Sequence, residues 1–158
     1  MLIKEALATS VSSVTEEELG RFKYLSMRKG EAGWMITYSF ENPIVAAEQG
    51  QDADINVVVC QEALDIQDIA ALPQLEYLNL DHTELPEGSL ETLSSLKMIT
   101  CDYIQLDMLR LALGDAAKGL ERLNASHLKG LEELSYFPGL KSLEMEDCRE
   151  ISDISALA

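Results

Sequence analysis

The stretch Leu75-Glu-Tyr-Leu78-Asn-Leu80 is the clearest copy of a pattern that recurs through about two thirds of this 158-residue chain. Its leucines follow the spacing Leu-x-x-Leu-x-Leu, and degenerate copies of that spacing begin at Ile55, Leu96, Leu120 and Leu140. Successive copies are therefore 20, 21, 24 and 20 residues apart. A period of this kind predicts a repeat architecture, in which each unit buries its apolar face against its neighbours.

The alternation inside each copy decides which side chains face the core. Successive side chains of a strand point to opposite faces, so Leu78 and Leu80 are predicted to face inward, while Tyr77 and Asn79 face outward. Phasing the five copies against one another predicts four outward columns. These columns are Val57, Tyr77, Met98, Arg122 and Ser142; Val59, Asn79, Thr100, Asn124 and Glu144; Gln61, Asp81, Asp102, Ser126 and Glu146; and Glu62, His82, Tyr103, His127 and Asp147.

The segments between the strands must return the chain so that each strand stacks parallel to the one before it. The longest, residues 107–118, has a helical composition and accounts for the 24-residue period. The first and fifth copies also share the string Ile-x-Asp-Ile-x-Ala-Leu, at Ile66–Leu72 and Ile151–Leu157. The pattern therefore predicts short strands alternating with turns or short helices.

These motifs resemble the leucine-rich repeat family, specifically its short bacterial-type repeats, over roughly residues 55–158. The resemblance implies an α/β leucine-rich repeat solenoid, a partial horseshoe with a short parallel sheet of about five strands. The chain departs from the family after the Leu-x-Leu core, where the family usually carries asparagine. These positions hold Ala63, Thr83, Ile104, Leu128 and Cys148, of which cysteine is the family's other accepted residue.

Residues 1–54 do not share the repeat, and we expect them to cap its N-terminal end within one continuous domain. Two strand-like runs, Phe22–Met27 and Trp34–Phe40, flank a glycine-bearing segment, which predicts a β-hairpin. In the second run, alternate aromatic and apolar side chains share one face. We expect this aromatic cluster to seal the core, the alternative being an exposed binding patch.

Charge and composition narrow the class of partner. The chain carries 28 Asp and Glu against 12 Lys and Arg, a formal net charge of −16, and is 47% hydrophobic. The hydrophobic content predicts a folded chain rather than a disordered acidic one. The negative charge disfavours nucleic acid and membrane surfaces as partners, and it favours either a basic protein partner or solubility alone.

The sequence predicts a cytoplasmic protein with reduced thiols. Its first residues do not read as a signal peptide, and no apolar run approaches the roughly 18 residues of a membrane span. Its three cysteines are odd in number and widely spaced, which fits reduced thiols, and the lack of a Cys-x-x-Cys pair argues against a zinc knuckle. Cys60 and Cys101 occupy inward positions, so we predict core thiols there, and we expect Cys148 to be buried in its turn.

No motif in the sequence predicts catalysis. A glycine-rich phosphate loop, Ser-His-Asp spacing and a paired-carboxylate signature are all missing. His82 and His127 fall two repeats apart in the fourth column, which is too far for them to share a metal ion. We therefore predict a non-enzymatic protein with no catalytic residues, no metal and no cofactor.

The outward columns are the predicted binding surface. Aromatic side chains dominate interface energetics, and stacked carboxylates are unfavourable unless a cation pairs with them. The predicted partner-binding residues are Tyr77, Asn79, Asp81, His82, Asp102, Tyr103, Glu144, Glu146 and Asp147. The alternatives are that these residues form solvated strand ends, or that the hairpin or the C-terminal edge strand binds instead.

We interpret the chain as a protein–protein interaction module, and the sharper hypothesis is a small acidic bacterial immunity protein or antitoxin. Such a protein binds and neutralises a cognate toxin. Toxins that cut nucleic acid are commonly basic, and an acidic surface speeds association with them. Two alternatives stay open: a scaffolding leucine-rich repeat module that forms a homo-oligomer through its C-terminal edge strand, and a regulatory inhibitor of a cellular enzyme.

Overall fold

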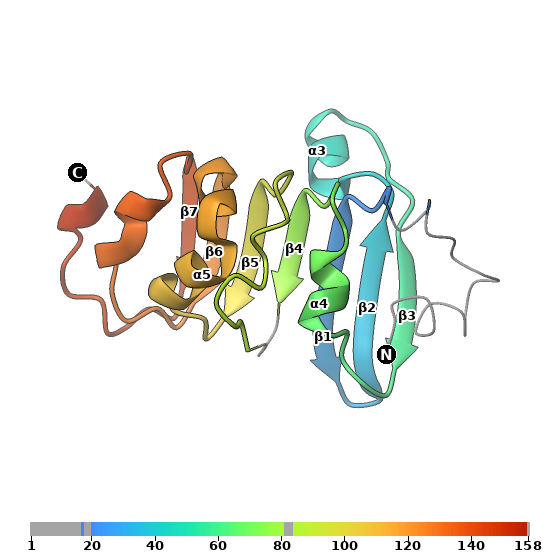
Figure 1. Ribbon diagram of the computed structural model, residues 1–158, viewed down its shortest axis with the longest axis horizontal. Helices are drawn as coiled ribbons and strands as arrows, with labels where there is room; N and C mark the ends of the chain where they lie inside the picture. The colour runs from blue at the N-terminus through green and yellow to red at the C-terminus, as the bar shows by residue number, and fades with distance from the viewer. Residues whose placement is uncertain (1–16, 18–19, 81–83, 158) are drawn as a thin grey trace.

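A computed structural model describes residue 17, residues 20–80 and residues 84–157, which form an α/β structure around one mixed sheet (Figure 1). The elements are β1 (Tyr24–Gly30), β2 (Gly33–Ser39), α3 (Pro43–Glu48), β3 (Asn56–Cys60), α4 (Ile66–Ala70), β4 (Tyr77–Leu80), β5 (Met98–Asp102), α5 (Leu106–Leu113), η1 (Gly114–Gly119), β6 (Arg122–Ser126), η2 (Glu132–Tyr136), β7 (Ser142–Glu146) and η3 (Ser155–Leu157).

The seven strands of the sheet lie in the order β3-β2-β1-β4-β5-β6-β7. The strands from β1 through β4, β5, β6 and β7 run parallel, whereas β2 is antiparallel to both of its neighbours. The predicted columns hold from β4 onward, because Tyr77, Met98, Arg122 and Ser142 are in register across four strands. The sheet is therefore larger than the predicted five-stranded parallel one, and mixed.

The β-hairpin predicted near the N-terminus is confirmed as β1 and β2. Its turn is shorter than expected, because the register continues to the pair Gly30 and Gly33 and leaves only Glu31 and Ala32 between them. Gly33 has a φ of +128°, and a Cβ at this position would lie 2.4 Å from the carbonyl oxygen of Cys60. Only glycine tolerates both the backbone angle and the close approach of β3.

The place of β3 differs from the prediction. We expected this strand to stack beside β4, and that expectation is wrong, because β3 pairs antiparallel with β2 at the far edge. β1 lies beside β4 instead, with Leu25 opposite Leu78. Leu25 and Met27 of β1, like Val58 and Cys60 of β3, are buried apolar residues two positions apart, so the period-two pattern alone does not distinguish the two strands as neighbours of β4. The hairpin therefore lies between β3 and β4, on the N-terminal side of the strands β4 to β7.

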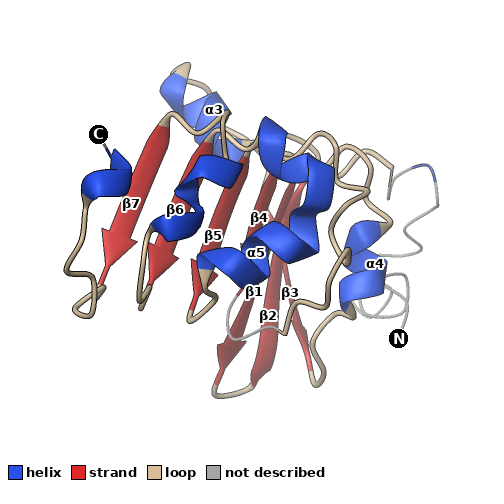
Figure 2. Ribbon diagram, turned by 60° about the vertical axis from the view of Figure 1, so that its left-hand side comes forward, coloured by secondary structure: helices blue, strands red, loops and turns tan. Residues whose placement is uncertain are grey.

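The hydrophobic core lies between the sheet and the short helices α4, α5 and η1, which cover one face (Figure 2). Leu78, Ile99 and Leu123 form a row of buried side chains across β4, β5 and β6. The prediction that hairpin aromatics seal the core is confirmed for Phe22 and Tyr38, which are both buried with ring centroids 4.9 Å apart. These apolar contacts join the hairpin to the rest of the sheet.

The three thiols are free. The predicted core positions of Cys60 and Cys101 are confirmed, since both side chains are buried. Burial, with a smaller contribution from the neighbouring carboxylate of Asp102, raises the pKa of Cys101 to about 12. Cys148 is half-buried, and its Sγ approaches the carbonyl oxygen of Glu146 at 3.2 Å.

The opposite, open face of the sheet is partly covered by α3. The side chain of Asn42 caps this helix by accepting hydrogen bonds from the backbone N–H groups of Ile44 (3.2 Å) and Val45 (3.4 Å). Ile44 lines a hollow of about 300 Å³ together with Tyr77 and Met98 of the open face. Within the residues that the structure describes, no helix has the length and apolar character that crossing a bilayer requires.

Candidate functional site

A column of three side chains marks the ends of β5, β6 and β7. Tyr103, His127 and Asp147 each follow the last residue of their strand, and each has left-handed backbone, with φ of 60°, 58° and 50°. Apart from glycines, no other residue in the described part of the chain has positive φ. Left-handed backbone is uncommon for such residues, so its repetition shows that one turn geometry ends all three strands.

The rings of Tyr103 and His127 stack on each other within this column. Their centroids are 3.9 Å apart and their planes are inclined by 13°. The imidazole is also held from the side, because its Nδ1 lies 2.9 Å from Oδ1 of Asp102, which accepts a hydrogen bond from the hydroxyl of Ser126 as well. The four residues therefore form one cluster, the β5–β6 cluster, in which a carboxylate orients the imidazole.

The bonding inside the β5–β6 cluster differs from that of a nucleophilic dyad. In a dyad the hydroxyl donates to the imidazole, which then removes its proton. Here Ser126 donates to Asp102, so the imidazole of His127 is oriented by the same carboxylate and does not activate the hydroxyl. Among the described residues, no group of three or more His, Cys, Asp or Glu side chains is arranged to hold a metal ion.

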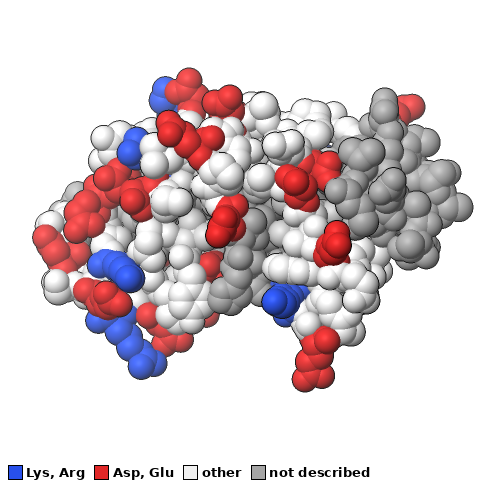
Figure 3. All heavy atoms as spheres, turned by 60° about the horizontal axis from the view of Figure 1, so that its bottom comes forward, with Lys and Arg blue, Asp and Glu red and all other residues white. Residues whose placement is uncertain are grey.

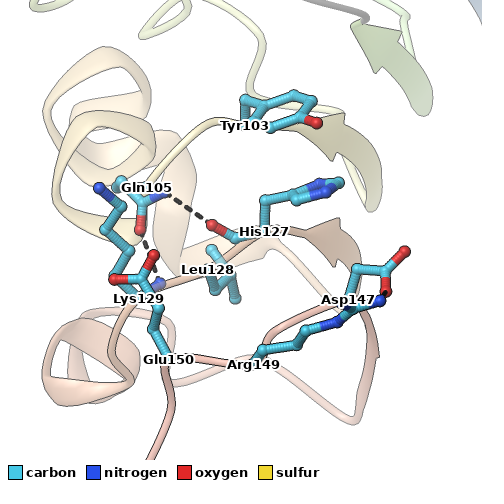
Figure 4. A pocket seen from close by; sticks show the side chains of 8 residues that line it. All are labelled: Tyr103, Gln105, His127, Leu128, Lys129, Asp147, Arg149 and Glu150. Atoms are coloured by element: carbon cyan, nitrogen blue, oxygen red, sulfur yellow. Dashed lines mark hydrogen bonds and ion pairs between the residues drawn. The ribbon is translucent and has the colours of Figure 1, made fainter.

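A groove of about 640 Å³ opens beside the cluster, and Figure 4 shows its lining side chains. Gln105, in the loop after β5, is hydrogen-bonded to the loop after β6. Its amide nitrogen donates to the carbonyl of His127 (3.0 Å), and its amide oxygen accepts from the backbone N–H of Lys129 (2.9 Å). On the opposite side, Arg149 donates to the carboxylate of Asp147 at 3.0 Å. The groove thus has a fixed polar wall and an exposed charged wall.

Exposed carboxylates gather on β7 and the turn that follows it. Glu144, Glu146, Asp147 and Glu150 are all exposed. Arg149 pairs with Asp147, and the amide of Asn124 donates to Glu144. In Figure 3, which brings the bottom of Figure 1 forward, Asp and Glu spheres spread over this side, with Lys and Arg in small separate groups. The C-terminal strands therefore present an acidic surface.

Several predicted partner-binding residues meet at this end of the sheet. Asp102 and Tyr103 belong to the β5–β6 cluster, Asp147 lines the groove, and Glu144 and Glu146 lie next to it on the open face of β7. Tyr103 is exposed at its rim. Two more of the predicted partner-binding residues, Asp81 and His82, lie outside the described residues.

The predicted exposure of Tyr77 and Asn79 is wrong. Their exposed fractions are only 8% and 4%. The ring of Tyr77 stacks on Tyr24, with centroids 4.6 Å apart, and lines the hollow under α3, and its hydroxyl is hydrogen-bonded to the hydroxyl of Thr100 at 3.0 Å. Asn79 lies between Ser26 and Thr100, in the middle of the sheet. Both residues are buried because β1 lies beside β4 and α3 partly covers the open face, and the sequence pattern predicted neither position.

Four residues that line this end were not predicted: Arg28, Gln105, Lys129 and Arg149. Arg28 shares an open-face hollow with Asp102 and Glu146, because β1 lies beside β4. That position follows from the strand order, which the spacing of the leucines does not encode. Gln105, Lys129 and Arg149 each stand two residues beyond the fourth predicted column, a regular spacing in the sequence that would have pointed to them.

An ion pair fastens α3 across the open face. Glu48 at the end of α3 accepts a hydrogen bond from the guanidinium of Arg122 on β6. This hydrogen bond holds the pKa of Glu48 below its ordinary value of 4.5 and raises that of Arg122. The pair therefore links the helix over Tyr77 to a strand next to the groove.

We expect acid to loosen α3 from the sheet. A carboxyl whose folded-state pKa is lowered stabilises the folded form above its ordinary pKa, and this contribution is lost as the pH falls below 4.5 through the folded-state value. Amide-exchange protection factors of α3, measured by NMR, should fall over that range. Glu48→Gln should remove the step, whereas Asp115→Asn, which breaks a distant pair with Lys118, should leave it. A step that persists in Glu48→Gln contradicts this assignment.

Comparison of the chain with protein-family models, curated proteins and solved structures found no match.

Proposed function

We propose that this chain is a non-enzymatic protein-binding module of the leucine-rich repeat kind, and that it binds a basic protein through the acidic C-terminal end of its sheet. The proposal is supported by two features that occur at the same place. Exposed carboxylates of β7 and its turn lie beside the groove and the exposed ring of Tyr103. Aromatic anchors next to a charged rim are typical of protein interfaces.

The parallel strands support the repeat assignment. From β4 to β7, equivalent residues are in register at sequence intervals of 21, 24 and 20, as in Tyr77, Met98, Arg122 and Ser142. On β4, β5 and β6, Leu78, Ile99 and Leu123 are buried in the core. The residues that follow them, Asn79, Thr100 and Asn124, point to the open face. β1 takes part in the same stack without belonging to the sequence repeat.

The charge distribution supports a basic partner. Glu121, which precedes β6, pairs with Lys97 and Lys141, which precede β5 and β7. On β7 itself, Glu144 and Glu146 form no ion pair with another described residue, and the net charge of the chain is −16. Stacked or adjacent carboxylates are relieved by a cationic surface, which they also attract over long range.

The sharper proposal is that the partner is a toxin and that the chain is its cytoplasmic bacterial immunity protein or antitoxin. A small acidic chain that covers the basic surface of a nucleic-acid-cutting toxin blocks its substrate by occupying the same charges. The alternatives are a scaffolding module that self-associates through the C-terminal edge strand and an inhibitor of a cellular enzyme, but the acidity of β7 favours a strongly basic partner.

The test is co-expression with the product of the gene next to this one, followed by isothermal titration of the two purified proteins. We expect the chain to restore growth that the neighbouring product inhibits. The triple variant Glu144→Gln, Glu146→Gln and Asp147→Asn should bind about tenfold or more weakly, because each exposed charge pair contributes about 0.2–1 kcal/mol.

A matched control carries the same charge change elsewhere. Glu31→Gln, Glu41→Gln and Glu87→Gln neutralise three exposed carboxylates outside β5, β6 and β7. This control should protect growth and bind as the unmodified chain does, apart from a small loss of long-range attraction. Equal loss in both triple variants would mean that net charge alone matters. No binding by the unmodified chain would contradict the proposal.

A further inference from the structure

The outer side of β7 is an unpaired strand edge. β7 is the last strand of the sheet order, and β6 is its neighbour there. The N–H of Ser142 and the C=O of Glu146 point toward β6, since they bond to Glu121 and His127. Backbone groups of successive residues alternate sides, so those of Leu143 and Met145 point outward. In the part of the chain that the structure describes, no backbone hydrogen bond reaches them.

The two sides of this edge differ in chemistry. On the open face, Glu144 and Glu146 are exposed carboxylates. On the helix side, Met145, Ile154 and Leu157 are 38%, 65% and 51% exposed, which is high for large apolar side chains. A strand added here would place alternate side chains against carboxylates on one face and against apolar side chains on the other.

Charge argues against a second copy of this chain as the added strand. Two β7 strands related by a two-fold axis pair antiparallel, and pairing over their full length sets Glu144 opposite Glu144 and Ser142 opposite Glu146. Directly opposed like charges destabilise a strand pair, and each copy brings a net charge of −16. The complementary occupant is instead a segment that alternates Lys or Arg with apolar residues.

We propose that β7 binds its partner by strand addition, accepting an extended segment of alternating basic and apolar residues from the basic protein. The added strand bonds to the outward backbone groups of Leu143 and Met145. Its cations pair with Glu144 and Glu146, and its apolar side chains cover Ile154 and Leu157. This inference rests on the proposed function and adds how the partner is held.

The test uses the whole chain, labelled with ¹⁵N, and three blocked six-residue peptides. One alternates Lys and Val, one has three Lys followed by three Val, and one alternates Glu and Val. We expect the Lys–Val alternating peptide to shift the amide signals of β7 and to bind about tenfold more tightly than the block peptide, which is the effect of two favourable cross-strand pairs. The Glu–Val peptide should not bind.

Protein variants separate the backbone and charge contributions. Met145→Pro removes one outward N–H without touching the hydrogen bonds to β6, and should weaken binding of the alternating peptide about tenfold, whereas Met145→Val should retain it. Glu144→Lys with Glu146→Lys should reverse the preference to the Glu–Val peptide. An alternating peptide N-methylated at one central lysine and one central valine, which blocks donors on both of its edges, repeats the backbone test without altering the chain.

The outcomes separate this inference from the proposed function. Equal binding of the alternating, block and N-methylated Lys–Val peptides would overturn strand addition, as would a preference that the charge reversal leaves unchanged. A toxin that Met145→Pro still binds fully would overturn the inference and leave the proposed function standing. A dimer of the unmodified chain that Met145→Pro dissociates, measured by light scattering, would show that a second copy occupies the edge and would also overturn it.

Discussion

Replacing Leu78 with alanine is expected to lower the free energy of unfolding by about 2–5 kcal/mol, which is a large fraction of the stability of a typical small domain. Leu78 is fully buried in β4, with Leu25 of β1 on one side and Ile99 of β5 on the other. Packed neighbours on both sides restrict the collapse of the cavity, so the cost should lie in the upper part of that range. Urea unfolding followed by circular dichroism measures the change.

Leu143→Ala is the matched control for this substitution. Leu143 occupies the same row of the sheet on β7, but it is only half-buried and has a described strand on one side alone. The same loss of atoms should therefore cost about 1 kcal/mol. Equal costs at Leu78 and Leu143 would contradict the strand order, because that order makes one position interior and the other an edge.

Replacing Gly33 with alanine is expected to cost about 3 kcal/mol or more and to separate β3 from β2. The φ of +128° lies in a region that residues with a Cβ rarely adopt, and the new methyl group would stand 2.4 Å from the carbonyl oxygen of Cys60. Backbone on both sides of this contact must shift to relieve it. Trp34, the single tryptophan, is adjacent, so its fluorescence during urea unfolding reports the loss.

Gly50→Ala separates the two causes. Gly50 also has positive φ, +69°, but a Cβ there meets no atom within 4 Å. Its substitution should cost about 1 kcal/mol, which is the price of left-handed backbone alone. If Gly33→Ala costs no more than Gly50→Ala, β3 does not pack against the hairpin as closely as the structure shows.

The inward rows of the sheet were predictable because alternation along a strand encodes them directly. Leu78, Leu80, Ile99 and Leu123 were expected to face inward, and all four are buried. The pairing of β4 was not predictable in this way. Leu25 and Met27 of β1 alternate as well as Val58 and Cys60 of β3 do, so the choice between the strands depends on tertiary packing of the hairpin aromatics.

The candidate site was likewise predictable in part. The register placed Tyr103, His127 and Asp147 in one column, and the structure brings them together with left-handed backbone, which no residue spacing encodes. The burial of Tyr77 depends on α3, a helix of only six residues that is too short to leave a periodic signal. The sequence therefore predicted where side chains point better than it predicted what covers them.

The strand order also bears on how the chain folds. Each pairing from β4 to β7 joins residues 20 to 24 positions apart, whereas Tyr24 pairs with Tyr77, 53 positions away (77 − 24). Closing a longer loop costs more entropy, and contacts distant in sequence form more slowly. We therefore expect β4 to β7 to pair early through local contacts, and β1 to pair with β4 only after the hairpin has formed. The pairing of β1 with β4 should then limit the folding rate.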